Sequence, residues 1–292
     1  MQKKIRFIIN PNSGSGNKQH FAEWINAQID KNKFAIEICY TDAPGHATTL
    51  SLEAKQLSYY AVVAVGGDGS VNETAKGLVG SETALGIIPT GSGNGMARHL
   101  KIPVDFKKSV SLLNYSQIEK IDTLSIDSHF CAGTFGIGFD AHIAHLFSKA
   151  GSRGYSTYVK LVLREFYKYP THQYNLVVDG KNIFIESFLL TFANSSQFGN
   201  NAVIAPFADV KDGKIDIAVV KKFKAIFAPH LIYRMMNNQL QGSRFFETMQ
   251  AQQILVQNKG LLKGHIDGEP VVFEEDVKVT INPLSLRVLV AG

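Results

Sequence analysis

The chain has little cysteine, a single tryptophan and no long run of apolar residues. Its two cysteines, Cys39 and Cys131, lie far apart in the sequence without a second metal-ligand residue close by. This spacing excludes a disulfide framework and a zinc-finger pattern. The longest apolar stretch, residues 61–65, is far shorter than the roughly 18 to 20 residues that span a bilayer. We therefore expect no transmembrane helix.

Composition and charge exclude several further classes. The 292 residues are 45% hydrophobic and 10% aromatic, unlike disordered or collagen-like chains. At about 150 residues a domain, the length predicts two domains. Lys and Arg number 30 against 25 Asp and Glu, and the net charge of +5 is too mild to indicate a nucleic-acid partner. Residues 1–4 lead into a β-like run without a cleavage site, so we expect a cytoplasmic protein.

Strands and helices alternate through the first 120 residues. Strands separated by helical segments of this length predict a parallel α/β sheet. The expected strands cover 5–9, 34–40, 60–65 and 84–88, and the expected helices cover 17–30, 46–58 and 71–79.

The pattern changes after residue 120 to many short runs rich in Val, Ile, Phe and Thr. Asp-Gly pairs at 179–180 and 212–213 break these runs, which is typical of hairpins. We therefore expect a mostly antiparallel β domain, entered through a helix over 140–168. The predicted domains are residues 1–120 and residues 121–292.

Three of the expected strands in the first domain end in glycine-rich loops, at residues 10–16, 66–73 and 89–95. In an open α/β sheet, ligands bind beyond the carboxyl ends of the strands. Loops without side chains let phosphate oxygens approach backbone N–H groups, and Ser13, Ser70 and Ser92 add hydroxyl donors. One such loop alone is as readily a tight turn, but three at one sheet edge predict a phosphate site.

None of the loops fits a standard nucleotide motif. No Gly-Lys-Ser/Thr follows any of them, which argues against a P-loop. Gly14 and Gly16 begin a Gly-x-Gly, but Gln19 stands where a dinucleotide fingerprint needs its third glycine.

Asp68 lies inside the second glycine loop. Phosphates repel a carboxylate unless a metal ion or a substrate hydroxyl lies beside it. In phosphoryl transfer a carboxylate can accept the proton of the attacking hydroxyl, so Asp68 indicates kinase chemistry. The alternative is a structural Asx-turn or helix N-cap.

With these loops the chain resembles the lipid-kinase superfamily of bacterial diacylglycerol kinases, sphingosine kinases and ceramide kinases. The matching pieces follow the family's order along nearly the whole chain. They are Asn10-Pro11-x-Ser13-Gly14, Gly66-Gly67-Asp68-Gly69-Ser70-x-Asn72-Glu73, Pro89-x-Gly91-Ser92-x-Asn94, Gly136-x-Gly138-x-Asp140 and Asp267-Gly268-Glu269.

The resemblance implies a Rossmann-like parallel α/β domain that binds ATP, followed by a β-sandwich that receives the lipid. Thr41, which opens Thr41-x-x-x-Gly45-His46-Ala47, matches the family's segment after the second strand. The nucleotide contacts that the resemblance implies are Asn10, Ser13, Thr41, Gly66, Gly67, Asp68, Gly69, Ser70, Val71, Asn72, Glu73, Gly91, Ser92, Asn94 and Asp267.

The resemblance also implies roles in the second domain. Glu269 matches the proposed general base of the bacterial branch, whereas the segment alone favours a hairpin turn with solvated carboxylates. Asp140 matches the residue that contacts the acceptor head group in sphingosine kinases, and Arg153 is a candidate phosphate partner beside it.

Some members of the family hold a structural Mg²⁺ on the β domain at an Asp-Gly turn. Here the matching ligands are Asp212 with Asp209 and Lys214, and an ordinary Asp-Gly hairpin turn is the alternative. One departure concerns the acceptor. Bacterial diacylglycerol kinases usually have Asp where this chain has Gly95, and sphingosine and ceramide kinases have a small residue there.

Basic and aromatic residues interleave between 145 and 169, where Lys160, Arg164 and Lys168 share one helical face. A helix of this kind can lie at an anionic lipid surface, and a second basic cluster surrounds Phe223 at 221–224. We therefore expect peripheral membrane association, with a solvated helix face as the alternative.

The function that we predict is an ATP-dependent, Mg²⁺-dependent lipid kinase. In it Glu269, together with Asp68, takes the proton of the attacking lipid hydroxyl. The acceptor would be diacylglycerol or a sphingoid or ceramide-like lipid. The alternatives are a phosphotransferase on a soluble acceptor, as in NAD kinase, and a nucleotide-responsive lipid-binding protein without turnover. The oligomeric state stays open, a homodimer included.

Overall fold

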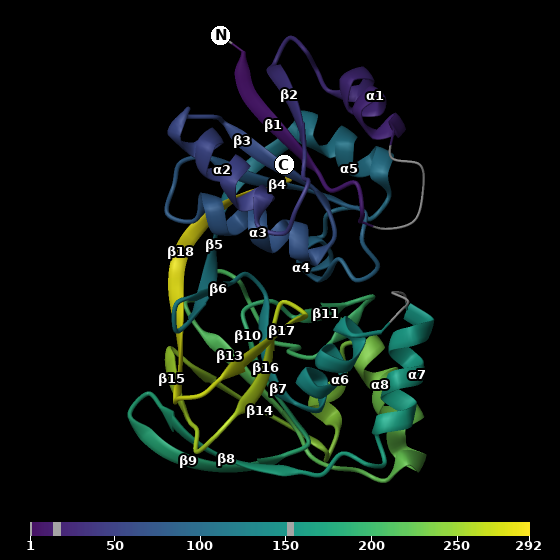
Figure 1. Cartoon of the computed structure of the whole chain (residues 1–292), viewed down its shortest axis with the longest axis vertical. Helices are drawn as coiled ribbons and strands as arrows, with labels where there is room; N and C mark the ends of the chain where they lie inside the picture. Colours follow the sequence, from purple (N-terminus) through teal and green to yellow (C-terminus); the bar gives the residue numbers. More distant parts are fainter. Residues whose placement is uncertain (1, 14–18, 151–154) are drawn as a thin grey trace. The chain divides into compact units, whose positions relative to one another are not determined.

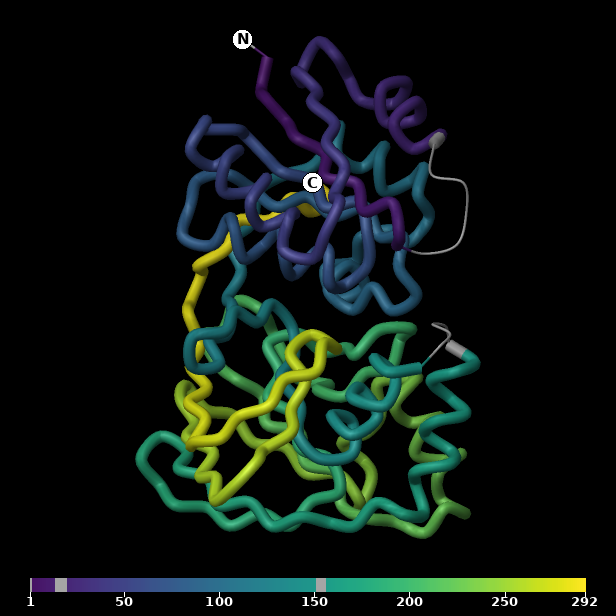
Figure 2. The backbone as a smooth tube through the Cα atoms, viewed as in Figure 1, coloured from purple at the N-terminus to yellow at the C-terminus, as the bar shows by residue number. Residues whose placement is uncertain are grey.

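The computed structural model describes residues 2–13, 19–150 and 155–292. The chain forms two compact units, the first comprising residues 1–122 and 283–292 and the second residues 123–282. The domains predicted from the sequence, 1–120 and 121–292, place the end of the chain in the second domain. In the structure the last ten residues belong to the first unit. Figure 2 shows this final segment in yellow as it leaves the second unit and ends within the first.

The first unit is built on a parallel sheet in the order β2-β1-β3-β4 (Figure 1). Its elements lie close to the ranges that hydrophobic periodicity predicts. They are β1 (Lys3–Ile9), α1 (Gln19–Gln28), β2 (Phe34–Tyr40), α2 (His46–Gln56), β3 (Ala61–Gly66), α3 (Asp68–Leu78), β4 (Ala84–Pro89), α4 (Gly95–His99), α5 (Phe106–Leu112) and the short 3-10 helix η1 (Leu113–Tyr115).

Helices cover both faces of this sheet, because alternate residues of each strand point to opposite sides. On one face, Phe7 of β1 packs in a core with residues of α1 and α5, and Phe21 stacks on Phe106 at 4.3 Å between ring centroids. On the other face, the guanidinium of Arg6 contacts the Leu50 carbonyl of α2 at 2.8 Å. The sheet is therefore buried on both sides, and its ligand-binding edge is the one where its strands end.

Two long strands, β5 (Ser116–Ile126) and β18 (Val277–Ala291), carry the chain between the units and pair with each other. The start of β18 pairs antiparallel with β15 in the second unit, where Val279 faces Ile254. Its end runs parallel to β4 in the first unit, where Val288 faces Leu85.

The second unit is a mostly antiparallel β structure with a large apolar core. One sheet has the order β14-β13-β10-β7-β16-β17, and β15, β8 and β9 continue from β18 in the other. Its strands are β6 (His129–Cys131), β7 (Thr134–Gly138), β8 (His172–Val178), β9 (Lys181–Ser187), β10 (Leu189–Ala193), β11 (Gln197–Gly199), β12 (Ala202–Val203), β13 (Ile215–Val220), β14 (Phe246–Ala251), β15 (Gln253–Gln257), β16 (Leu262–Ile266) and β17 (Glu269–Phe273).

The helices of the second unit pack at the margin of this core. They are α6 (Phe139–Ser148), α7 (Tyr155–Glu165), the 3-10 helix η2 (Ala225–Phe227), α8 (Ala228–Met236) and the 3-10 helix η3 (Leu240–Gly242). The single helix that we expected over 140–168 is two helices. α6 ends at Ser148, and α7 begins at Tyr155.

The α/β unit followed by an antiparallel β unit confirms the fold class that the sequence predicts. Among the described helices, none combines the length and the apolar character needed to cross a membrane.

Candidate functional site

The glycine loops meet at the edge of the first sheet where β1, β3 and β4 end. The side-chain amide of Asn10, just after β1, donates to the Ser70 hydroxyl at 3.1 Å. The hydroxyl of Ser13 lies 2.9 Å from that of Thr90, just after β4. The first loop is therefore hydrogen-bonded to both of the others, as the sequence predicts for loops at one sheet edge.

Asp68 joins the second loop to the third. Its Oδ2 accepts the N–H of Asn94 at 2.8 Å, and its Oδ1 accepts the N–H of Gly95 at 2.7 Å. Asn94 adopts a left-handed backbone with φ 54°, and its side chain exchanges two hydrogen bonds with the backbone of Gly91, at 3.0 and 2.8 Å. Asp68 thus caps backbone N–H groups of a neighbouring loop. This task resembles the Asx-turn or helix N-cap that was the alternative to a catalytic role.

Close backbone packing explains two of the glycines. A Cβ on Gly91 would stand 2.5 Å from the Cα of Gly67, where no side chain fits without backbone movement. Glycine at these positions lets the second and third loops touch. The loop glycines therefore serve loop packing as well as any approach of a ligand to the backbone.

The other predicted nucleotide residues surround these loops. Thr41 follows β2, and its N–H donates to the Ile9 carbonyl at 3.0 Å, which places it beside Asn10. Val71 turns its side chain into the core, whereas Ser92 is exposed. Gly66 ends β3, Gly69 lies in the first turn of α3, and Asn72 and Glu73 are half-buried on that helix. Residues 14–18, including the glycines of the first loop, lie outside the described residues.

This edge offers backbone N–H groups, hydroxyls and the N-terminus of α3, an eleven-residue helix that begins at Asp68. A helix N-terminus carries a partial positive charge, and its first N–H groups have no partner within the helix. The arrangement suits an anionic ligand such as a chain of phosphates.

In the second unit, Asp267 and Gly268 form the tight turn between β16 and β17. Their φ angles are 49° and 88°, the left-handed pair that two-residue hairpins favour. The Asp267 carboxylate accepts the N–H groups of Ala132, Gly133 and Thr134, each at 2.8 Å. The turn is therefore fixed to the loop before β7, a structural task for Asp267 that its sequence context does not reveal.

Glu269 follows this turn as the first residue of β17 and is exposed. Within the described part of the chain its carboxylate has no hydrogen bond or ion pair. An accessible carboxylate on a fixed turn could accept a proton from a bound hydroxyl, and it equally fits the solvated hairpin that the segment alone suggests.

Asp140, at the start of α6, belongs to a buried polar group below the hairpin. Its Oδ2 lies 3.1 Å from Nε2 of His265 and accepts the Thr191 hydroxyl at 3.2 Å, while Oδ1 accepts the Ala141 N–H at 2.8 Å. Nδ1 of His265 accepts the N–H of Gly268 at 3.3 Å, so Nε2 carries the proton toward Asp140. The pair thus connects Asp140 to the turn that precedes Glu269.

Asp140 is buried, and its hydrogen-bond partners are groups of the protein itself. Its exposed fraction is 7%, and that of His265 is 4%. Gly136 is needed beside them, because a Cβ there would lie 2.2 Å from Oδ2 of Asp140. Contact of Asp140 with an acceptor head group stays a prediction. The second predicted substrate residue, Arg153, lies outside the described residues.

The predicted metal segment forms two local turns. Oδ1 of Asp209 accepts the Lys211 N–H at 3.0 Å, and Oδ1 of Asp212 accepts the Lys214 N–H at 3.0 Å. Burial raises the pKa of nearby Asp216 to about 6, and the negative charges of Asp212 and Asp209 add to the shift. A cation would relieve this accumulation of charge.

These residues fit a cation with one carboxylate and main-chain oxygens more readily than a site of several side chains. In residues 2–13, 19–150 and 155–292, no three His, Cys, Asp or Glu side chains gather in a way that could hold a metal. Asp212 would supply the side-chain ligand, and the carbonyls of Asp209 and Lys214 would complete the predicted set.

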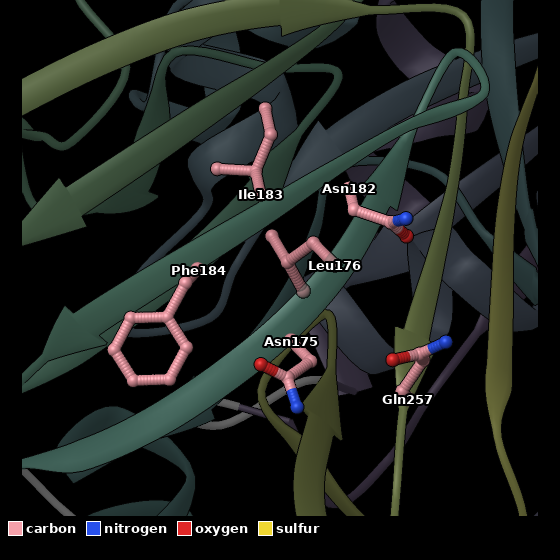
Figure 3. A pocket seen from close by; sticks show the side chains of 6 residues that line it. All are labelled: Asn175, Leu176, Asn182, Ile183, Phe184 and Gln257. Carbon is pink, nitrogen blue, oxygen red and sulfur yellow. The ribbon is translucent and has the colours of Figure 1, made fainter.

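A shallow pocket of about 380 Å³ lies on the second unit away from these residues, on β8, β9 and β15. Amide and apolar side chains line it and none of them can titrate, so it offers no acid, base or nucleophile (Figure 3). Its lining residues are Asn175, Leu176, Asn182, Ile183, Phe184 and Gln257.

Sequence reasoning missed three partners of the site residues: Thr90, Thr191 and His265. Thr90 lies within a motif that matches the family, but only its contact with Ser13 gives it a task. His265 lies near the end of β16, two residues before the turn residue Asp267, and this closeness in the sequence was the available signal that both side chains serve the same turn.

Comparison with known proteins covers both units. Residues 4–126 match the family model of the diacylglycerol kinase catalytic domain, and residues 133–290 match the YegS C-terminal NAD kinase beta sandwich-like domain. Diacylglycerol kinase of Mycobacterium tuberculosis is 30% identical over 227 residues, which are 75% of this chain and 73% of that protein. A Chromohalobacter salexigens protein named "Probable lipid kinase YegS-like" is 27% identical over 248 residues, 83% of this chain and 79% of that protein.

Solved structures show the same fold. A crystal structure of a diacylglycerol kinase from Bacillus anthracis has a TM-score of 0.74 with this chain at 18% identity, and the match covers 99% of this chain and 97% of that one. Both family models are matched in chain order, and a 30% identical relative is covered over most of its length. The chain therefore belongs to the diacylglycerol kinase family of lipid kinases.

Proposed function

We propose that this lipid kinase transfers the γ-phosphoryl group of ATP to a lipid hydroxyl, with Glu269 as the general base. The observation that carries the proposal is the accessible Glu269 carboxylate on a turn fixed by three hydrogen bonds to Asp267. In this reaction the hydroxyl oxygen bonds to the γ-phosphorus as the bond to the β–γ bridging oxygen breaks. The hydroxyl proton passes to Glu269, and ADP leaves.

The first unit would hold the nucleotide. Backbone N–H groups of the glycine loops and the N-terminus of α3 suit the phosphates, and Asn10 with Ser70 would add side-chain donors. ATP would enter as its Mg²⁺ complex, which lowers the charge of the phosphates. Asp68 would keep the second and third loops together, because both of its oxygens already accept backbone N–H groups.

Diacylglycerol is the first acceptor to test, because the Mycobacterium tuberculosis relative carries that name. Sphingosine and ceramide should be tested as well, because Gly95 departs from the bacterial diacylglycerol kinase pattern. NAD serves as the soluble control, because the second family model is described as NAD kinase-like.

The test is transfer of labelled γ-phosphate to these acceptors in mixed micelles by the native chain and by Glu269→Gln. Loss of a general base lowers kcat about 10²- to 10⁴-fold, with little change in ATP affinity. Glu274→Gln is the matched control, because Glu274 is an exposed carboxylate just beyond the other end of β17. Near-native turnover by Glu269→Gln would reject Glu269 as the base, and label on NAD alone would reject the lipid acceptor.

A structural Mg²⁺ at Asp212 forms a separate part of the proposal. Added Mg²⁺ should raise the melting temperature of the native chain and leave that of Asp212→Asn unchanged in the absence of ATP. Equal responses of the two proteins would contradict the site. The accumulation of negative charge around Asp216 supports it.

We also propose peripheral membrane association through α7 and the turn after it. Lys160, Arg164 and Lys168 are exposed there, in line with a basic face toward anionic lipid. Replacing these three residues with Gln should weaken binding to anionic vesicles at low salt, and unchanged binding would leave the solvated-face alternative.

A further inference from the structure

Helix α8 exposes a row of apolar side chains. Pro229, Ile232, Tyr233 and Met236 follow the spacing i, i+3, i+4 and i+7, so they share one face of the helix. The exposed fractions are 52% for Ile232, 60% for Tyr233 and 42% for Met236. Buried Leu231 already packs the helix onto the second unit. The exposed row is therefore a second apolar face, which an ordinary surface helix does not have.

The row continues into η2, where Ile226 lies three residues before Pro229 and is 80% exposed. We refer to Ile226, Pro229, Ile232, Tyr233 and Met236 together as the α8 stripe. Single exposed apolar residues are common on protein surfaces, but a continuous row of large ones usually marks a contact surface.

The chain segment that carries the α8 stripe has charge of one sign. Residues 217–246 contain five Lys or Arg side chains and no Asp or Glu. Lys224 and Arg244 are exposed, and Arg234 lies on α8 itself. The next acid along the chain, Glu247, pairs with Lys221.

We propose that the α8 stripe is a membrane-docking surface and that its occupant is an anionic lipid bilayer. An apolar helix face bordered by basic side chains suits the boundary between head groups and acyl chains, and tyrosine suits the same depth. The proposal rests on the proposed function in one respect: a lipid acceptor brings the enzyme to a bilayer.

The charge pattern favours lipid over a second copy of this chain. In a twofold dimer the same surface meets itself, so the basic residues of one copy would face those of the other, and residues 217–246 contain no acid to pair with them. An anionic bilayer complements both the apolar row and the charge around it.

The test is sedimentation with vesicles of phosphatidylcholine, alone or mixed with phosphatidylglycerol, without nucleotide. The double variant Ile232→Ser/Met236→Ser should bind the mixed vesicles at least about tenfold more weakly than the native chain. Leu57→Ser is the matched control, because Leu57 is 55% exposed in the first unit and should bind as the native chain does. Lys224→Gln should weaken binding at low salt only, since salt screens surface charge.

A fluorescence measurement shows whether the α8 stripe enters the bilayer. Trp24 is the sole tryptophan, so Trp24→Phe/Tyr233→Trp carries its only indole on the stripe. Brominated lipid in the mixed vesicles should quench this indole. Absence of quenching, or native binding by Ile232→Ser/Met236→Ser, would overturn the proposal.

Analytical ultracentrifugation of the same proteins tests the second copy as the occupant. The native chain should sediment as Ile232→Ser/Met236→Ser does, and a dimer lost in that variant would overturn the proposal in favour of a self-interface. Label transfer to a detergent-dispersed acceptor reports the proposed function separately. The variant should retain it, so failure of docking and failure of catalysis are distinguishable.

Discussion

Replacement of Asp68 by Asn tests whether this residue holds the glycine loops together. Its two carboxylate oxygens accept the N–H groups of Asn94 and Gly95 at 2.8 and 2.7 Å. An asparagine has one acceptor oxygen, so its NH₂ group would face one of these N–H donors. Hydrogen bonds to charged groups contribute about 1.5–3 kcal/mol, and the abandoned N–H adds a cost of its own. We expect the free energy of unfolding of Asp68→Asn to be about 2–3 kcal/mol lower than that of the native chain.

The loosened third loop should also bind ATP more weakly, since loop packing fixes the positions of its N–H groups. Urea unfolding measures the first effect, and calorimetric titration with ATP measures the second. Asp105→Asn is the matched control in the same unit, because Asp105 caps α5 through one N–H, at 2.9 Å, and Asn caps helices equally well. Equal free energies of unfolding of the two variants would show that Asp68 does not hold the second and third loops together. Native stability and ATP affinity combined with lost turnover would instead favour Asp68 as a base.

Three further predictions follow from contacts in the two units. Gly91→Ala should destabilise the protein by about 2 kcal/mol or more, because its Cβ would overlap backbone; urea unfolding beside the exposed-loop control Ser92→Ala checks this. Asp267→Asn should lower the free energy of unfolding by about 2 kcal/mol, because its NH₂ group would face one of the three N–H donors. The loosened turn before the proposed base should also lower kcat. A native free energy of unfolding together with a native kcat would show that Asp267 does not fix the turn. Burial, with the adjacent Asp267 carboxylate, raises the pKa of the Cys131 thiol. A thiol reagent at mildly alkaline pH should therefore modify only the half-buried Cys39 until urea exposes the second thiol, and two rapid equivalents in the native protein would disprove this.

Local patterns predicted the elements of the first unit because periodicity and turn residues act over short distances. The strand expected at 34–40 is β2, and the loops after β1, β3 and β4 meet as parallel-strand geometry requires. The helix expected over 140–168 was too long, because α6 ends at Ser148 and a separate helix, α7, begins at Tyr155.

Long-range contacts could not be predicted from the sequence in the same way. Asp267 reaches the N–H of Ala132 across 135 positions, and nothing in either segment encodes that partner. Likewise, Asp68 was identified by its motif, but its hydrogen bonds to the third loop depend on how β3 and β4 pair. The sequence therefore placed these residues in turns and loops, but it could not show which groups each of them contacts.

The return of residues 283–292 to the first unit affects the order in which the chain can fold. Because β18 supplies the strand beside β4, a ribosome must synthesise the whole second unit before the sheet of the first can be completed. Until then β4 has an open edge, where unpaired backbone groups can bind strands of other chains. The second unit is in effect an insertion into the first, and removal of the last ten residues would damage the unit that lies farthest from them in the sequence.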